Sequence, residues 1–136
     1  MSRILILTLL LSFLFINANS QTLQTIDSLE KAKQNCLDAG MAMTSCSSLF
    51  YHQMDSILNV VYKKVYFKNN TSQKIELKKS QLQWLKERDS YFKQTIKENK
   101  KEAEKDETLK HFSTMLNLQE MAAFVQERVV YLIKLL

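Results

Sequence analysis

The sequence has a single glycine, Gly40, and no proline among its 136 residues. The many tight turns of a β-sandwich or barrel rely on these residue types, so an all-β fold is strongly disfavoured. One glycine also cannot build the glycine-rich loop that holds phosphates in Rossmann and P-loop nucleotide sites. Hydrophobic residues make up 46% of the chain, which is a poor fit to a disordered protein. The composition therefore predicts one small all-α domain.

The N-terminal residues have the layout of a cleaved secretory signal peptide. A positively charged start is followed by an almost unbroken apolar run at 4–16, and the small residues Ala18 and Ser20 occupy positions −3 and −1 of a cut. This run is shorter than the roughly 20 residues of a membrane-spanning helix, although an uncleaved anchor is the alternative interpretation. We predict a signal peptide at 1–20, a mature domain at 21–136, and an exported protein, either periplasmic or secreted.

The two cysteines, Cys36 and Cys46, both lie in the predicted mature chain. In an oxidising compartment, two cysteines ten positions apart most simply form one disulfide. Closing so short a loop contributes about 2–3 kcal/mol in the chain-entropy description. That is a large share of the stability of so small a domain.

Apolar residues at spacings of three and four predict three long helices after a short first one. The short helix ends near Asn35, and residues 36–46 form a connection pinned by the disulfide. The second helix spans about 47–67, and a loop at 68–72 follows, with Ser72 as the cap of the third helix.

The third helix begins near Gln73, and the last begins near Leu109. The charged segment 97–110 between them is predicted to be a solvated helix face or connection. Together the helices are predicted to form a small antiparallel bundle, three long helices plus a short N-terminal one. The residues predicted to face its core are Phe50, Met54, Ile57, Leu58, Val61, Tyr62 and Val65 on the second helix, Leu77, Leu82, Leu85, Phe92 and Ile96 on the third, and Phe112, Met115, Leu116, Ala122, Val125, Val129, Leu132, Ile133 and Leu136 on the last.

Polar side chains interrupt the apolar faces of the second and third helices. Asp55 and Asn59 lie one turn apart on the second helix, and Gln81 and Arg88 form a similar strip on the third. A charged group at a helix interface costs several kcal/mol unless it is paired. We therefore predict an ion pair between Asp55 and Arg88, with Asn59 and Gln81 satisfying the remaining donors and acceptors. Direct contact with a ligand is the alternative role.

These polar residues belong to a longer spaced pattern. Its positions are Cys36, Cys46, Asp55, Leu58, Asn59, Tyr62, Gln81, Trp84, Arg88 and Asp89. The pattern resembles the lysozyme inhibitor LprI-like N-terminal domain family, best over 36–92 and more faintly as far as Arg128. The resemblance implies an exported helical protein that binds and blocks a lysozyme.

The chain departs from the family pattern at a second cysteine pair. Members commonly carry one cysteine just after the Arg-Asp pair, where this chain has Tyr91 and Phe92. They carry the partner cysteine shortly before the final arginine, where this chain has residues such as Met121. Because both halves of the bridge are missing together, we predict that apolar packing replaces it.

An inhibitor of a lysozyme has to occupy the cleft in which two carboxylates flank the sugar bond. Rigid segments do this at the least entropic cost. The two candidate segments are the disulfide-pinned stretch 37–45 and the loop 68–72, in which Lys68, Asn69 and Asn70 could pair with a lysozyme carboxylate.

Between Lys63 and Lys110 lie fourteen of the nineteen basic residues, beside eight acidic ones. This surplus favours an alternative function, a non-enzymatic envelope-interaction module that binds anionic cell-surface components. The segment lacks the arginine-rich stripe with interleaved aromatic residues that is typical of nucleic-acid binding, so no nucleic-acid partner is predicted.

Two further functions are weighed against simpler roles. A sulfur-rich set suited to Cu(I) comprises Met41, Met43, Cys46, His52 and Met54. Packing and the disulfide account for these residues more simply, so no metal or cofactor is predicted. His52 and His111 fall on different predicted helices without a nucleophile or acid motif around them, and an enzyme is not predicted.

Overall fold

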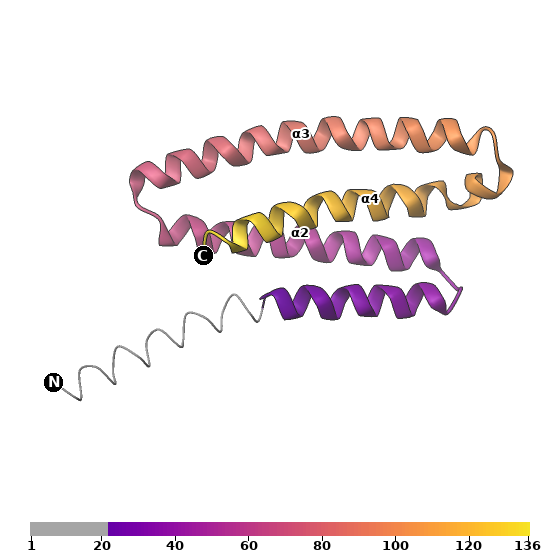
Figure 1. Ribbon diagram of the computed structural model, residues 1–136, viewed down its shortest axis with the longest axis horizontal. Helices are drawn as coiled ribbons and strands as arrows, with labels where there is room; N and C mark the ends of the chain where they lie inside the picture. Colours follow the sequence, from indigo (N-terminus) through magenta and orange to yellow (C-terminus); the bar gives the residue numbers. More distant parts are fainter. Residues whose placement is uncertain (1–21) are drawn as a thin grey trace.

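The computed structural model describes residues 22–136, which form four helices and contain no strand. The predicted signal peptide at 1–20 lies outside these described residues. The elements are an N-terminal helix at 22–38, α2 (Met43–Lys68), α3 (Thr71–Ala103) and α4 (Glu107–Ile133). Consecutive helices run antiparallel (Figure 1). The predicted all-α bundle and the predicted disulfide between Cys36 and Cys46 are both confirmed.

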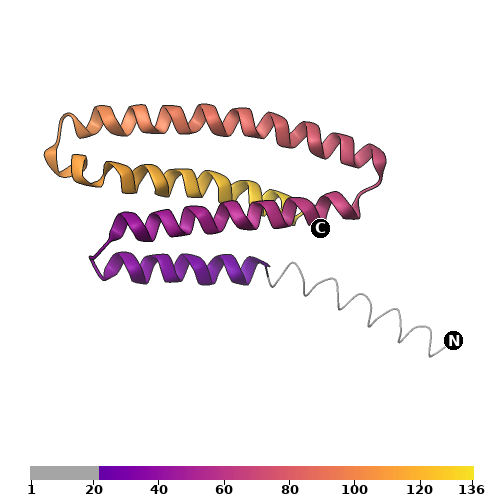
Figure 2. The same cartoon turned by 180° about the vertical axis from the view of Figure 1, so that it is seen from behind.

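The helices are arranged so that α4 lies between α2 and α3, as both views show (Figures 1 and 2). The contacts of α4 are accordingly made mainly with these two helices. The N-terminal helix lies along α2 and also reaches α4, since Gln126 Nε2 donates to Glu30 Oε1 at 2.9 Å. All four helices therefore contribute to one core, and α3 packs at its edge, mainly against α4.

The core consists mainly of the facing apolar stripes of α2 and α4. Its buried members are Ile26 from the N-terminal helix, Phe50, Met54, Leu58, Val61 and Val65 from α2, Leu77 and Trp84 from α3, and Ala122, Val125, Val129, Leu132 and Ile133 from α4. The inward face predicted for the second helix is confirmed, because its two remaining members, Ile57 and Tyr62, pack against the same core. On α4 the predicted residues Phe112, Met115 and Leu116 are only half-buried.

The prediction for α3 is partly wrong. Leu77 is buried, and Leu85 and Phe92 pack against the core, but Leu82 is 62% exposed and Ile96 is 47% exposed. The reason is the position of α3 at the edge of the bundle. A helix that packs on one side only can bury a narrow stripe, so apolar residues beyond that stripe remain in solvent.

The connections are shorter than predicted. Only residues 39–42 lie between the N-terminal helix and α2, and only Asn69 and Asn70 lie between α2 and α3. The charged segment 97–110 is mostly helical, because α3 continues to Ala103 and the turn to α4 consists of residues 104–106.

The start of α3 is capped by Asn70 and not by the predicted Ser72. The Asn70 side chain accepts a hydrogen bond from the backbone N–H of Gln73, whose side chain in turn accepts from the backbone N–H of Asn70. This reciprocal capping box satisfies two backbone donors that a helix start would otherwise leave unpaired.

The turn at 39–42, which we call the disulfide turn, reverses the chain with two left-handed residues. Gly40 has φ 72° and Ala42 has φ 54°. The disulfide joins Cys36 to Cys46 across it with a Cα–Cα distance of 5.9 Å. The backbone N–H of Gly40 also donates to the carbonyl of Leu37 at 2.9 Å. The turn is therefore held by a covalent bond and by its own backbone.

Substitutions at the two left-handed residues are expected to have opposite effects. Gly40→Ala should lower the free energy of unfolding by about 1 kcal/mol, because an L side chain is strained there. A Cβ at this position would meet no atom within 4 Å, so the cost comes from the backbone alone. Ala42→Gly should raise the free energy of unfolding by up to about 1 kcal/mol by relieving the same strain. Urea unfolding of the oxidised proteins measures both, and a loss of stability in Ala42→Gly would contradict the argument.

Candidate functional site

The buried cation of the bundle is Arg128 on α4, a residue only 9% exposed. Its Nε donates to Oε1 of Gln81 at 3.1 Å, and its Nη2 donates to Oγ of Ser80 at 3.0 Å. The guanidinium also lies 5.7 Å from the ring centroid of Trp84 and 4.8 Å from that of Tyr131. Arg128 thus joins α3 to α4 through hydrogen bonds and aromatic faces.

Burial lowers the pKa of Arg128 from its ordinary value, with neighbouring tyrosine and glutamate groups acting in the opposite direction. Arginine nevertheless stays charged in proteins. A buried charge of this kind is tolerated because its Nε and Nη2 atoms donate hydrogen bonds and its flat faces contact aromatic rings. The arginine at the end of the family pattern, Arg128, therefore has a structural role: it holds α3 against α4.

The predicted ion pair between Asp55 and Arg88 is wrong. Arg88 pairs with its neighbour Asp89, with Nη2 and Oδ1 2.7 Å apart, and no ion pair joins Asp55 to Arg88 within residues 22–136. Asn59 donates to the backbone carbonyl of Asp55 at 2.9 Å. The correction has a physical cause, because Arg88 lies at the edge of the interface, with 25% of its side chain exposed, and a neighbouring carboxylate satisfies it there.

Gln81 is also not a partner of Asp55, since it binds Arg128. Asp55 and Arg88 do lie close enough to affect the same phenol, that of Tyr51. Burial raises the pKa of Tyr51, the carboxylate of Asp55 raises it further, and the charge of Arg88 lowers it. The polar residues predicted to lie along α2 and α3 are therefore near one another, but their hydrogen-bond and ion-pair partners differ from those predicted.

Aromatic rings occupy the place of the missing second disulfide. Tyr91 stacks on Phe124 of α4 with centroids 4.6 Å apart, and Phe92 meets the same ring at 6.3 Å. Trp84 stacks on the ring of Phe124 at 5.9 Å, and Phe92 reaches Tyr51 of α2 at 6.1 Å. Apolar packing between α3 and α4 thus stands near the position at which the resemblance implied a second bridge.

This network has no unmet polar group that calls for a ligand. Among the described residues, no buried side-chain nitrogen or oxygen lacks a hydrogen-bond partner. The remaining motif residues also have structural places, since Leu58 lies in the core and Tyr62 packs against it. Gln81, Trp84 and Leu58 of the motif thus lie between helices, whereas Asn59 and Asp89 are exposed and bond within their own helices.

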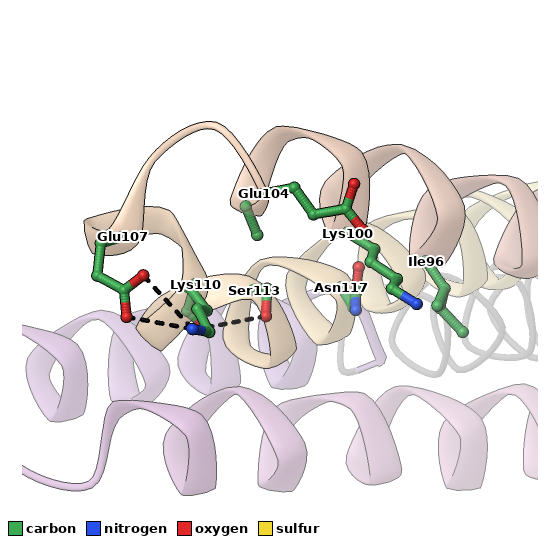
Figure 3. Close-up of a pocket in the computed structure, with 8 residues that line it drawn as sticks. Ile96, Lys100, Glu104, Glu107, Lys110, Ser113 and Asn117 are labelled. Carbon is green, nitrogen blue, oxygen red and sulfur yellow. Dashed lines mark hydrogen bonds and ion pairs between the residues drawn. The ribbon is translucent and has the colours of Figure 1, made fainter.

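A cavity of about 540 Å³ lies beside the turn from α3 to α4 (Figure 3). Lys100 and Glu104 line it from the end of α3, and Glu107 and Lys110 line it from α4, with Ile96 and Ala103 among the apolar walls. Lys110 Nζ lies 3.3 Å from Oε1 of Glu107. Two lysines balance two glutamates, so the cavity has no strong preference for an ion of either sign.

The residues weighed for metal binding and catalysis do not form a site in the described structure. Cys46 is bonded to Cys36 and offers no thiolate, Met54 is fully buried, and Met41 is 77% exposed. His52 on α2 and His111 on α4 are both exposed. Across residues 22–136, no group of three His, Cys, Asp or Glu side chains could hold a metal ion.

The two candidate binding segments lie at opposite ends of the bundle. The disulfide turn and the turn from α3 to α4 share one end, whereas Asn69 and Asn70 lie at the other, near the C-terminus (Figure 1). The most exposed apolar side chain near each end is Met41, at 77%, and Phe67, at 75%. Because α2 alone, at about 1.5 Å per residue, is roughly 39 Å long, the two segments cannot occupy the same cleft.

Removing Arg128 should destabilise the fold far more than removing Arg88. We expect Arg128→Ala to lower the free energy of unfolding by about 2 kcal/mol, because Gln81 and Trp84 lose their partner. Arg88→Ala should cost less than about 1 kcal/mol, as is usual for an ion pair at the surface. Urea unfolding followed by circular dichroism compares the two. Equal losses would show that Arg128 is not the dominant cation of the seam.

The chain matches the family described as "Lysozyme inhibitor LprI" over residues 21–132. Comparisons with curated proteins and with solved structures give no match. The matched span includes the disulfide, the polar strip, Arg128 and all of the described helical residues except the end of α4. The chain therefore belongs to the lysozyme inhibitor LprI family.

Proposed function

We propose that this protein inhibits a lysozyme by direct contact and that the disulfide turn enters or covers the enzyme's cleft. Membership of the lysozyme inhibitor LprI family is the observation that carries the proposal. The protein itself performs no reaction in this mechanism. It excludes the polysaccharide from the two carboxylates that flank the scissile sugar bond.

The rigidity of the disulfide turn supports its role as the contact. The turn spans only residues 39–42 and is closed by the bond between Cys36 and Cys46. A segment that is already ordered loses little conformational entropy on binding. Met41 projects from this turn with most of its surface exposed. An exposed thioether on a fixed backbone can fill an apolar sugar subsite at low entropic cost.

The loop at the other end is less suitable. The side chain of Asn70 is occupied by the capping box of α3, so its oxygen already accepts a hydrogen bond. Lys68 lies on the same helix as Lys63 and Lys64, which makes that part of α2 basic. Many lysozymes are themselves strongly basic, and like charges slow their association.

The charge near the disulfide turn is more favourable. The N-terminal helix carries two lysines against three carboxylates, those of Asp27, Glu30 and Asp38. A basic lysozyme that approaches this helix and its turn meets no local excess of positive charge. Long-range repulsion is therefore smallest on the side of the molecule away from α3.

The disulfide and the family membership both support a place outside the cytoplasm. We infer that export proceeds through the predicted signal peptide. Intact mass spectrometry of the protein recovered from an exporting bacterium should give the mass of the chain that begins at Gln21, two hydrogens lighter for the disulfide. Recovery of the uncut chain in the membrane fraction would instead establish an N-terminal anchor.

A pair of matched substitutions tests which end of the molecule binds. In a lysis assay titrated against several lysozymes of different charge, Met41→Ser should weaken inhibition at least tenfold, as expected for a contact worth about 1.4 kcal/mol. Phe67→Ser removes an equally exposed apolar side chain at the opposite end and should leave inhibition unchanged.

The reverse result would move the contact to the loop at 68–72. If neither substitution changes a measurable inhibition, the contact lies on the helices and the assignment to the disulfide turn is wrong. If the folded, oxidised protein inhibits no lysozyme in the panel, lysozyme inhibition itself is rejected for this chain.

A further inference from the structure

The positive charge of the described chain resides on one helix. Helix α3 contains nine lysines and arginines against five aspartates and glutamates. The other described residues contain nine basic and nine acidic side chains, so their formal charges cancel. Helix α3 lies at the edge of the bundle (Figures 1 and 2), and most of its charged side chains are exposed.

Four lysines of α3 recur at intervals of seven residues, namely Lys79, Lys86, Lys93 and Lys100. We call them the lysine row. An interval of seven residues advances about 10.5 Å along a helix and drifts only about 20° around it. The row therefore extends along α3 for roughly 31 Å as a shallow line and does not form a compact cluster.

All four lysines of the row are exposed, and none has an ion-pair or hydrogen-bond partner among residues 22–136. Other lysines of the same helix behave differently. Lys74 and Lys78 lie over the ring of Tyr66 on α2, at 5.1 and 5.3 Å from its centroid. Lys74 and Lys78 thus contact the bundle, whereas the row is exposed to solvent and ends at Lys100, which also borders the cavity beside the turn to α4.

The acidic residues of α3 form no ion pair with the row in the described chain, and α3 keeps a net positive charge after they are counted. Asp89, the carboxylate between the second and third lysines, is paired with Arg88 at 2.7 Å. Glu87 accepts a hydrogen bond from Gln83 at 2.9 Å, and Glu98 accepts one from Gln94 at 2.8 Å. Lysines about 10 Å apart lie close to the screening distance at 0.1 M salt, so their fields overlap without strong mutual repulsion.

We propose that the outer face of α3 binds an extended, linear polyanion of the cell envelope, which lies along the lysine row. The positive charge of the lysine row favours an anionic partner. The spacing of the lysines along a line favours a polymer over a single small anion. Lysines contact repeating anionic groups as point charges, so the row requires no particular sugar or backbone chemistry. The proposal does not depend on lysozyme inhibition.

The apolar content of the same face argues against a lipid surface as the partner. The strongly exposed apolar residues of α3 are Ile75, Leu82 and Ile96, which are separated by seven and fourteen positions. A helix that lies in a bilayer interface needs a continuous apolar face. None of the helices in residues 22–136 has the length and apolarity to cross a membrane.

The experiment compares two variants that lose the same charge. In the first, all four lysines of the row are changed to glutamine. In the control, four lysines away from α3 are changed in the same way: Lys31, Lys63, Lys64 and Lys134. Binding of the oxidised protein to fluorescently labelled long-chain polyphosphate is measured at 50 to 200 mM NaCl, with circular dichroism to confirm that both variants fold.

The affinity of the unsubstituted protein should fall about 50-fold between 50 and 200 mM NaCl. This follows if each of four lysine contacts releases about 0.7 counterions from the polyanion. The row variant should lose most of this salt dependence, with the slope of log affinity against log salt falling by about 3. The control variant should keep a slope close to that of the unsubstituted protein.

Equal slopes in the two variants would overturn the proposal, because the attraction would then reflect net charge alone. Binding to phosphatidylglycerol vesicles without binding to polyphosphate would overturn it in favour of a lipid surface. The row variant should also keep whatever lysozyme inhibition the unsubstituted protein has. Failure of the polyanion proposal is thereby distinguished from failure of the proposed inhibition.

Discussion

The apolar contact between α2 and α4 is the interaction on which the rest of the structure depends. Met54, Val61 and Val65 of α2 and Val125, Val129 and Leu132 of α4 are all at most 1% exposed. Each side chain buried in this way contributes about 1.5–3 kcal/mol relative to exposure. This seam fixes the two helices against each other, and the N-terminal helix completes it with Ile26. The disulfide links the N-terminal helix to α2 at one end of this core. The disulfide turn is therefore attached to two helices that are fixed by packing.

Helix α3 is attached to this core from one side, and that position explains both its inner and its outer residues. On the inner side, Arg128 reaches out from α4 and binds Ser80 and Gln81, while Trp84 and Phe124 stack beside it. On the outer side nothing covers α3 in the described chain, so Leu82 and the lysine row stay in solvent. Arg128, Gln81 and Trp84 thus secure α3 to the bundle. This arrangement leaves the surfaces available for partners outside the motif.

The two proposed partner surfaces differ in chemistry and place. The disulfide turn is small, rigid and nearly uncharged, which suits insertion into a cleft. The outer face of α3 is long and basic, which suits a polymer. Because lysozymes act on envelope polysaccharide, a protein held on an envelope polyanion would stand where the enzyme attacks. The N-terminal helix and α3 lie on opposite sides of the bundle, so the two proposed surfaces are distinct (Figure 1).

The all-α class, the antiparallel bundle, the disulfide and the buried stripe of α2 could all be predicted from local pattern. One glycine without proline, period 3.6 in the apolar residues and two cysteines ten apart are properties of the chain itself. The partner of each polar residue could not be predicted. In more than one helix register, Asp55, Arg88 and Arg128 each face a group of opposite charge or another polar group. Only the packing of α3 on the outside of α4 decided that Arg128 is buried and Arg88 is not. The same packing leaves Leu82 and the four lysines of the row exposed. Periodicity shows which residues share a side of a helix, but it does not show which side packs against another helix.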